Sequence, residues 1–264
     1  MEYLNAPVVE TVIGVQFAPL VTFRSQHYGI LWQNYLKDLG WIPVADEALL
    51  PVYEEQFGEV KLKPSRNDDA ALGISKIRMK LRSQDTTRTV QIQPDKLYYS
   101  WGRTASDAQD YQIARLEFDG LFKEFQSFAE DNLSGAAQPN LWEIRYINQV
   151  PAGELWSRPS DWHRVLPKLF PEMIPRADGI EFATYDGMWY FEIEPKRGRI
   201  TVRVAKMIVN QTPEPVLFIM LTARGQTDEN CDWKAGLDLG HESCIKLFDE
   251  MTSEEARVAW RKRT

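Results

Sequence analysis

Two pairs of side chains have types and a spacing that could support chemistry. His241 and Cys244 lie three residues apart in an apolar stripe, so a helix would bring them to one face. A thiol beside a histidine can act as an activated nucleophile, but no third group orients this pair, which favours a buried thiol with a hydrogen-bonded histidine. Glu192 and Glu194 alternate along a strand, where paired acids can bind a metal or cleave glycosides. Without a neighbouring His or Asp, we expect a solvated face.

The chain lacks the short motifs that mark a catalytic or cofactor site. It contains no GxxxxGK[ST], strand-borne GxGxxG, GxSxG or HExxH pattern, and only three histidines. Cys231 and Cys244 belong to no CxxC pair and to no Cys/His cluster with zinc spacing. We therefore predict a non-enzymatic protein with no catalytic residues, cofactor or metal, and with unlinked cysteines. A hydrolase-like enzyme remains the third hypothesis.

Basic residues concentrate in two places. One segment contains Arg197, Arg199, Arg203 and Lys206, and a second group surrounds Trp260 near the C-terminus. Such runs usually form a solvated face, although these residues are also the candidate surface for a partner or a ligand. Trp260 lies in a short predicted helix preceded by a capping box, and we expect it to dock on the body of the protein.

Composition restricts the partners and the compartment. The net charge of −7 and the pI of about 5.2 disfavour nucleic acid and anionic membranes. No stretch approaches 18 uninterrupted apolar residues, and the N-terminus lacks a basic segment followed by an apolar run. We therefore predict a cytoplasmic protein without a membrane-spanning helix. The 9 Trp, 10 Tyr and 12 Phe indicate a well-filled core, or aromatic anchors for a partner.

The elements that must position these residues form two similar runs. In each half, a strand, a helix and four extended segments precede a long helix. In the first half we expect strands at 8–17, 52–62, 74–83, 86–93 and 96–101, helices at 23–39 and 107–132, and loops at 43–51 and 64–69. In the second half we expect strands at 141–150, 179–185, 188–194, 199–209 and 216–223, and helices at 162–170 and 233–249. The first of these helices is broken by Pro167 or starts anew beyond it.

The two runs predict a tandem duplication of an α+β unit. Residues 1–135 form the first β-α-β4-α repeat, residues 140–264 form the second with a short C-terminal helix, and 134–139 is the linker. Glu10 and Gln16 match Glu143 and Gln149 at one offset of 133 residues. We expect mostly antiparallel sheets, each covered by a long helix, that lie side by side as a saddle or pack face to face.

Four short segments together resemble a known family. They are Pro7-Val8-Val9-Glu10 running into Val15-Gln16-Phe17, Val90-Gln91-Ile92-Gln93 through Lys96 to Trp101, Tyr146-Ile147-Asn148-Gln149, and His241 through Phe248 to Thr252 and Trp260. Over essentially the whole chain, these segments resemble a sporadically distributed family of uncharacterised prokaryotic proteins. The resemblance implies no assigned activity and no catalytic residues, and the patchy occurrence of the family points to mobile gene sets such as phage defence or stress modules.

The preferred hypothesis is a non-enzymatic interaction protein. It would bind another protein or its own copy and act as a regulatory accessory subunit. The alternative is a saddle that binds a ligand or nucleic acid, with the open sheet face or the segment from Arg197 to Lys206 as its site.

Overall fold

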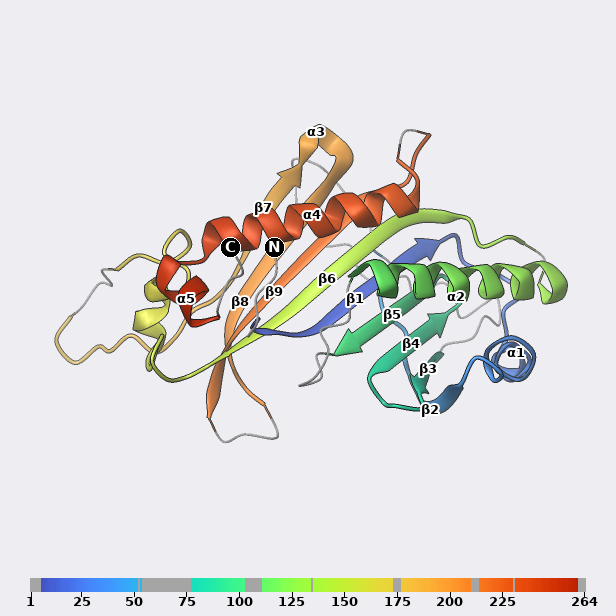
Figure 1. Ribbon diagram of the computed structural model, residues 1–264, viewed down its shortest axis with the longest axis horizontal. Helices are drawn as coiled ribbons and strands as arrows, with labels where there is room; N and C mark the ends of the chain where they lie inside the picture. The colour runs from blue at the N-terminus through green and yellow to red at the C-terminus, as the bar shows by residue number, and fades with distance from the viewer. Residues whose placement is uncertain are drawn as a thin grey trace.

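The chain folds into one continuous antiparallel sheet with its two long helices on one face. The computed structural model describes residues 6–51, 53, 77–102, 111–133, 135–172, 177–209, 214–229 and 231–260. Within these ranges the sheet has nine strands in the order β2-β3-β4-β5-β1-β6-β9-β8-β7 (Figure 1). The α+β class is confirmed, and the separate sheets expected for the two halves are replaced by one sheet in which the halves lie side by side.

The strands follow the alternation of the sequence. Their bounds are β1 Val8–Phe17, β2 Trp41–Ala48, β3 Ile77–Ser83, β4 Arg88–Gln93, β5 Lys96–Gly102, β6 Pro139–Pro151, β7 Asp186–Ile193, β8 Gly198–Ile208 and β9 Pro215–Gln226. The helical segments are α1 Ser25–Leu31, the π-helical turn η1 Trp32–Leu36, α2 Tyr111–Asn132, the 3₁₀ helix η3 Pro159–Arg164, the short turn α3 Glu194–Arg197, α4 Trp233–Met251 and α5 Glu254–Ala259.

Three expectations were wrong. The segment 43–51, expected as a loop, belongs largely to strand β2. The helix expected around 162–170 is the shorter 3₁₀ helix η3 at Pro159–Arg164. It ends before Pro167, where a break was expected, because proline lacks the backbone donor that would continue the helix. The segment 179–185 makes only an isolated bridge, between Ala177 and Ile180, so the described part of the second half has three strands after its first instead of four.

Other expectations fall outside the described residues. These are the strand at 52–62 apart from Tyr53, the loop at 64–69 and the first turn of the helix expected from 107. No helix within the described ranges is long and apolar enough to cross a membrane.

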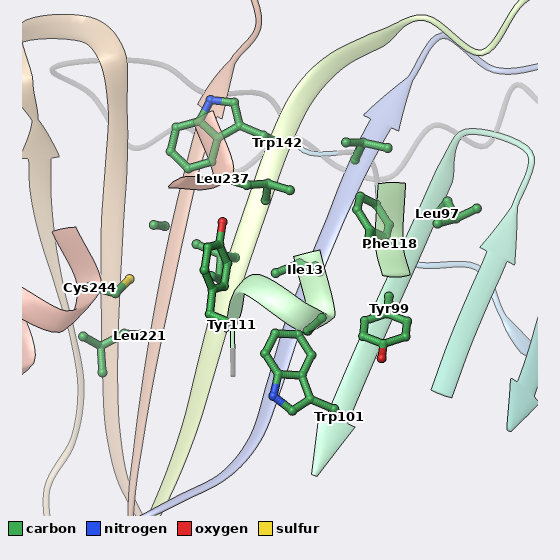
Figure 2. Close-up of a cluster of buried hydrophobic side chains, with 14 of the residues drawn as sticks. Ile13, Leu97, Tyr99, Trp101, Tyr111, Phe118, Trp142, Leu221, Leu237 and Cys244 are labelled. Atoms are coloured by element: carbon green, nitrogen blue, oxygen red, sulfur yellow. The ribbon is translucent and has the colours of Figure 1, made fainter. Parts of the chain in front are cut away.

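The helix face of the sheet carries the core. Helix α4 lies over β6, β8 and β9, and α2 lies over β1 and β5 (Figure 1). Aromatic and aliphatic side chains fill the space beneath both helices, including those of Ile13, Tyr99, Phe118, Trp142 and Leu237 (Figure 2). Because side chains alternate along a strand, the neighbours of these residues in sequence, such as Gly14, Tyr98 and Glu143, lie on the opposite face.

Glycines let α4 approach the sheet closely. A Cβ atom on Gly236 would lie 2.2 Å from Trp142 Cδ1, and one on Gly240 would lie 2.7 Å from Trp142 Cζ3. Gly236 and Gly240 are four residues apart and therefore lie on the same face of α4, where the indole ring packs directly against the helix backbone. The ring is fully buried.

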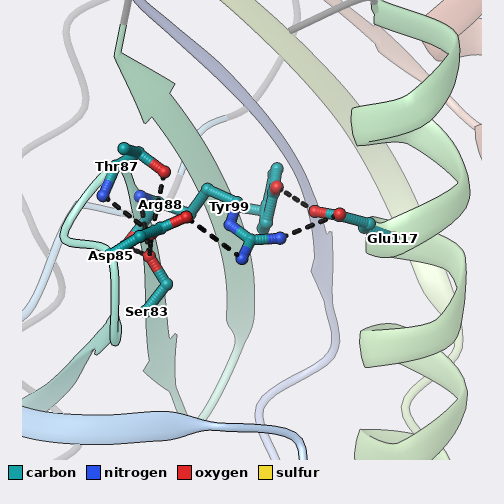
Figure 3. Close-up of polar contacts among 6 residues, drawn as sticks. All are labelled: Ser83, Asp85, Thr87, Arg88, Tyr99 and Glu117. Atoms are coloured by element: carbon teal, nitrogen blue, oxygen red, sulfur yellow. Dashed lines mark hydrogen bonds and ion pairs between the residues drawn. The ribbon is translucent and has the colours of Figure 1, made fainter. Parts of the chain in front are cut away.

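A polar network ties the β3–β4 turn to α2. The Asp85 carboxylate accepts hydrogen bonds from Ser83 Oγ at 2.5 Å and from the Thr87 backbone N–H at 3.1 Å. These bonds, with that from Ser83 first, lower the pKa of Asp85 to about 2. Arg88 then bridges the turn to the helix through Glu117 at 2.8 Å (Figure 3). The Tyr99 hydroxyl donates to the same Glu117 carboxylate, so one helix residue holds two strands.

Candidate functional site

Strand register brings charged residues of both halves together at the centre of the face opposite the helices. In the pairing of β5, β1, β6 and β9, Gly14 lies beside Tyr98 on one side and Glu143 on the other, and Glu143 lies beside Arg224. Arg145 is two residues along β6 from Glu143 and therefore on the same face. We call Lys96, Tyr98, Glu143, Arg145 and Arg224 the central cluster.

Glu143 is the buried anion of the central cluster. Its side chain is 1% exposed, and it accepts from Arg224 Nε at 2.7 Å and from Arg145 Nη2 at 2.6 Å. The Tyr98 hydroxyl completes the shell at 3.3 Å from Glu143 Oε2. Burial alone would raise the pKa of Glu143, but the charges of Arg224 and Arg145 outweigh burial and hold the pKa below its usual value. The carboxylate is thus ionised at neutral pH.

The missing side chain of Gly14 makes room for this contact. A Cβ at Gly14 would lie 2.1 Å from Tyr98 Cδ1 and 2.7 Å from the Leu97 carbonyl oxygen. Tyr98 therefore lies across the backbone of β1 and reaches Glu143 on the next strand. Burial, followed by the nearby negative charge of Glu143, raises the pKa of Tyr98 well above its usual value, so its hydroxyl keeps its proton.

Lys96 forms the second charged pair of the central cluster. Its side chain is fully buried, and Nζ lies 3.0 Å from Asp95 Oδ2. Burial lowers the pKa of Lys96, and Asp95 opposes that effect. Lys96 and Asp95 neutralise each other, whereas two arginines face the single carboxylate of Glu143. The central cluster and Asp95 together therefore carry a net charge of +1.

Leu50 and Tyr53 lie against the strands on this face, and we call these two residues the strap. Gln93 Oε1 accepts from the Leu50 N–H at 2.9 Å, and Gln93 Nε2 donates to the Leu50 carbonyl at 3.2 Å. Gln16 makes the same reciprocal pair with Tyr53, at 3.0 Å in both directions. The Tyr53 ring stacks on the Arg224 guanidinium, 3.7 Å from its Cζ. Side chains of the sheet thus bind both backbone groups of each strap residue.

The basic segment expected as one surface is divided by strand alternation. Arg199 and Arg203 lie on the face of the central cluster, and Arg199 is the register partner of Arg224. Lys206 lies on the other face of β8, and Arg197 lies in the turn before it, 3.8 Å from Glu194. Of these four residues, only Arg199 directly adjoins the central cluster.

Trp260 docks internally, as expected. It is 6% exposed, and its ring stacks on Phe248 with centroids 5.7 Å apart. It also lines a cavity of about 320 Å³ together with Pro7, Gln149 and Pro151. Trp260 is therefore a packing residue that closes one end of the β1–β6 seam.

His241 and Cys244 both lie on helix α4, and His241 contacts Tyr111 of helix α2. The Tyr111 ring stacks on His241 at 3.8 Å, and the Tyr146 hydroxyl lies 2.5 Å from His241 Nδ1. Burial raises the pKa of the Cys244 thiol to about 12, which disfavours a thiolate nucleophile at neutral pH. Both cysteines are free, in agreement with the sequence-based prediction.

Glu192 and Glu194 do not form a paired site. Glu192 lies on β7, whereas Glu194 begins the turn after it, with a positive φ of 37° that ends the strand alternation. Among the described residues, no group of three or more His, Cys, Asp or Glu side chains could hold a metal ion. No protein-family model matches the chain, and no curated protein matches it in sequence.

Proposed function

We propose that the chain is a non-enzymatic binding protein and that the face around the central cluster is its binding surface. The observation that supports this most is the way the face already holds polypeptide: Gln16 and Gln93 each engage the N–H and the carbonyl of a strap residue. Side-chain amides that pair with both groups of an extended residue recognise backbone, whatever its sequence. The partner we propose is therefore another protein.

The proposal includes the duplication. Outward from the seam, the first half has the strand order β1, β5, β4, β3, β2, and the second half has β6, β9, β8, β7. In both halves, the last strand of the meander returns to pair with the first strand, and a long helix follows. Glu143 and Arg224 come from the second half, while Tyr98 and Gln16 come from the first. A binding surface at the seam therefore needs both halves.

Paired charge reversals on β8 test the proposed surface. Arg203, with its side chain 46% exposed, lies on the face of the central cluster, whereas Lys206 is exposed on the other face of the same strand. Partners captured from the native host by the wild-type chain would be compared with those captured by Arg203→Glu and Lys206→Glu. We expect one partner to be lost with Arg203→Glu and retained with Lys206→Glu. Equal retention by both variants would contradict the assignment of this face.

Nucleic acid is the second candidate, because Arg199, Arg203 and Arg224 share one face. Asp186, 3.6 Å from Arg203, and the net charge of −7 oppose it. We expect weak binding that salt abolishes, since phosphate contacts depend steeply on ionic strength. A gel shift that persists at physiological salt and disappears when Arg199 and Arg203 are both changed to Glu would replace the protein partner with nucleic acid.

A further inference from the structure

The spacing of the two strap residues can be compared with that of the two glutamines that bind them. Gln93 and Gln16 both lie beside Lys96, on either side of β5, so they stand in one row and are about 10 Å apart, or two strand spacings. Leu50 and Tyr53 are three residues apart, and three extended residues also span about 10 Å. The two glutamine pairs therefore match the spacing of an extended chain that crosses three strands.

The chemistry beneath the strap selects an aromatic side chain. Tyr53 lies 3.7 Å from the guanidinium carbon of Arg224 and 5.5 Å from Lys96 Nζ, so two cations contact one ring. A ring between cations gains cation–π energy, which increases as the site is shielded from water. The strap residues thus show what this surface binds: backbone in extended form and an aromatic ring three residues further along.

We infer that the ligand of the central cluster is an extended segment of a partner protein that carries an aromatic residue, and that the strap occupies the place of this segment in the isolated chain. The inference rests on the proposed function and specifies its partner. Binding then requires the strap to leave, so the strap lowers the apparent affinity by the fraction of molecules in which the surface is vacated.

A labelled peptide provides the probe. It has the sequence of residues 48–55, ALLPVYEE, with fluorescein at its N-terminus, and its binding to the full chain is followed by fluorescence anisotropy. We expect Tyr53→Ala to bind the peptide about tenfold or more tightly than the wild-type chain does, because the variant lacks the ring that competes for Arg224. The same peptide with its tyrosine replaced by alanine should bind neither protein.

Two further variants separate release of the strap from general loosening. Leu50→Pro removes the backbone N–H that donates to Gln93 Oε1 and should raise peptide affinity by less than Tyr53→Ala does. Leu116→Ala shortens a side chain of helix α2 that is 70% exposed on the other side of the sheet, and it should leave affinity at the wild-type value. Thermal melts of each variant identify any that fail to fold.

The outcomes distinguish the inference from the proposed function. Equal affinity of the wild type, Tyr53→Ala and Leu50→Pro would overturn the competing role of the strap. No binding to any folded variant would overturn the inferred ligand, while a partner lost only with Arg203→Glu would leave the proposed function standing. If no variant binds the peptide and no partner is lost selectively with Arg203→Glu, the face around the central cluster is not a binding surface.

Discussion

Removing the charge of Glu143 should be the most damaging conservative change at the seam. Glu143→Gln preserves the shape of the side chain and one oxygen acceptor, but it leaves the cations of Arg224 and Arg145 without their anion. Breaking a buried ion pair in this way costs about 3–5 kcal/mol. The side chains of Arg145 and Arg224 remain 25% and 15% exposed, so water offsets part of the loss. We therefore expect the low end, about 3 kcal/mol of unfolding free energy.

Urea unfolding followed by circular dichroism measures this loss. A change of about 3 kcal/mol is a large share of the roughly 5–15 kcal/mol that stabilises most proteins, and it should lower the melting temperature by roughly 5–10 °C. The matched control is Glu192→Gln, an exposed carboxylate on the same face of β7. We expect the control to change stability by no more than about 0.5 kcal/mol.

The pH dependence tests whether the loss is electrostatic. Because the folded-state pKa of Glu143 lies below its usual value, this residue contributes stability that is fully present above the unfolded pKa and is lost as the pH falls through the folded pKa. The difference between wild type and Glu143→Gln should therefore be constant from neutral pH to about pH 5 and should shrink at lower pH. A loss below about 1 kcal/mol, or a difference that does not change with acidity, would refute the reasoning.

Further variants test the packing around the seam and the thiol. Gly14→Ala should cost about 1–3 kcal/mol in urea, because its Cβ would displace the Tyr98 ring, whereas Gly29→Ala, with no neighbour within 4 Å of its Cβ, should stabilise helix α1 by roughly 0.5–1 kcal/mol. Trp260→Ala should lower the unfolding free energy by about 3–5 kcal/mol because the ring is almost fully buried, and unchanged melting would exclude internal docking. Cys244, with its pKa raised to about 12, should resist iodoacetamide in the native protein at neutral pH and react in urea.

Local patterns in the sequence were sufficient to predict most elements. The run Val8–Phe17 is β1 with the predicted bounds, and helix α2, which carries the aromatic stripe, ends at Asn132 as expected. These elements are set by side chains that alternate on a strand or recur every turn of a helix, and a single segment shows such a pattern by itself.

Strand β2 was missed because Pro43 indicates a loop. Pro43 is tolerated because β2 is an edge strand, so its missing N–H interrupts no second ladder, and a register shift follows between Pro43 and Ala45. The segment 179–185 was wrongly predicted as a strand for the converse reason. Its composition permits an extended chain, but only an isolated bridge forms there, and nothing within the segment reports whether a neighbour is available.

The central cluster could not be predicted from the sequence, because its members are ordinary strand residues when taken one at a time. Glu143 and Arg145 alternate along β6 and resemble a solvated face. Arg224 lies 81 positions away along the chain from Glu143. Only the register of the strands makes them neighbours. One local signal was available, namely the glycine at position 14 within a β-branched strand, since glycine inside a strand marks close approach of another group.

Burial of the central cluster has an energetic cost that packing alone does not require. Apolar residues of similar volume in place of a buried ion pair are often as stable or more stable. Elsewhere the sheet follows that route, since a large cluster of buried apolar and aromatic side chains fills the space beneath α2 and α4. The charges of Glu143, Arg145 and Arg224 therefore call for a reason other than stability. Recognition of a polar backbone and an aromatic ring supplies one, because a surface of aliphatic side chains could hold neither the amide groups of the strap nor a ring by cation–π contact.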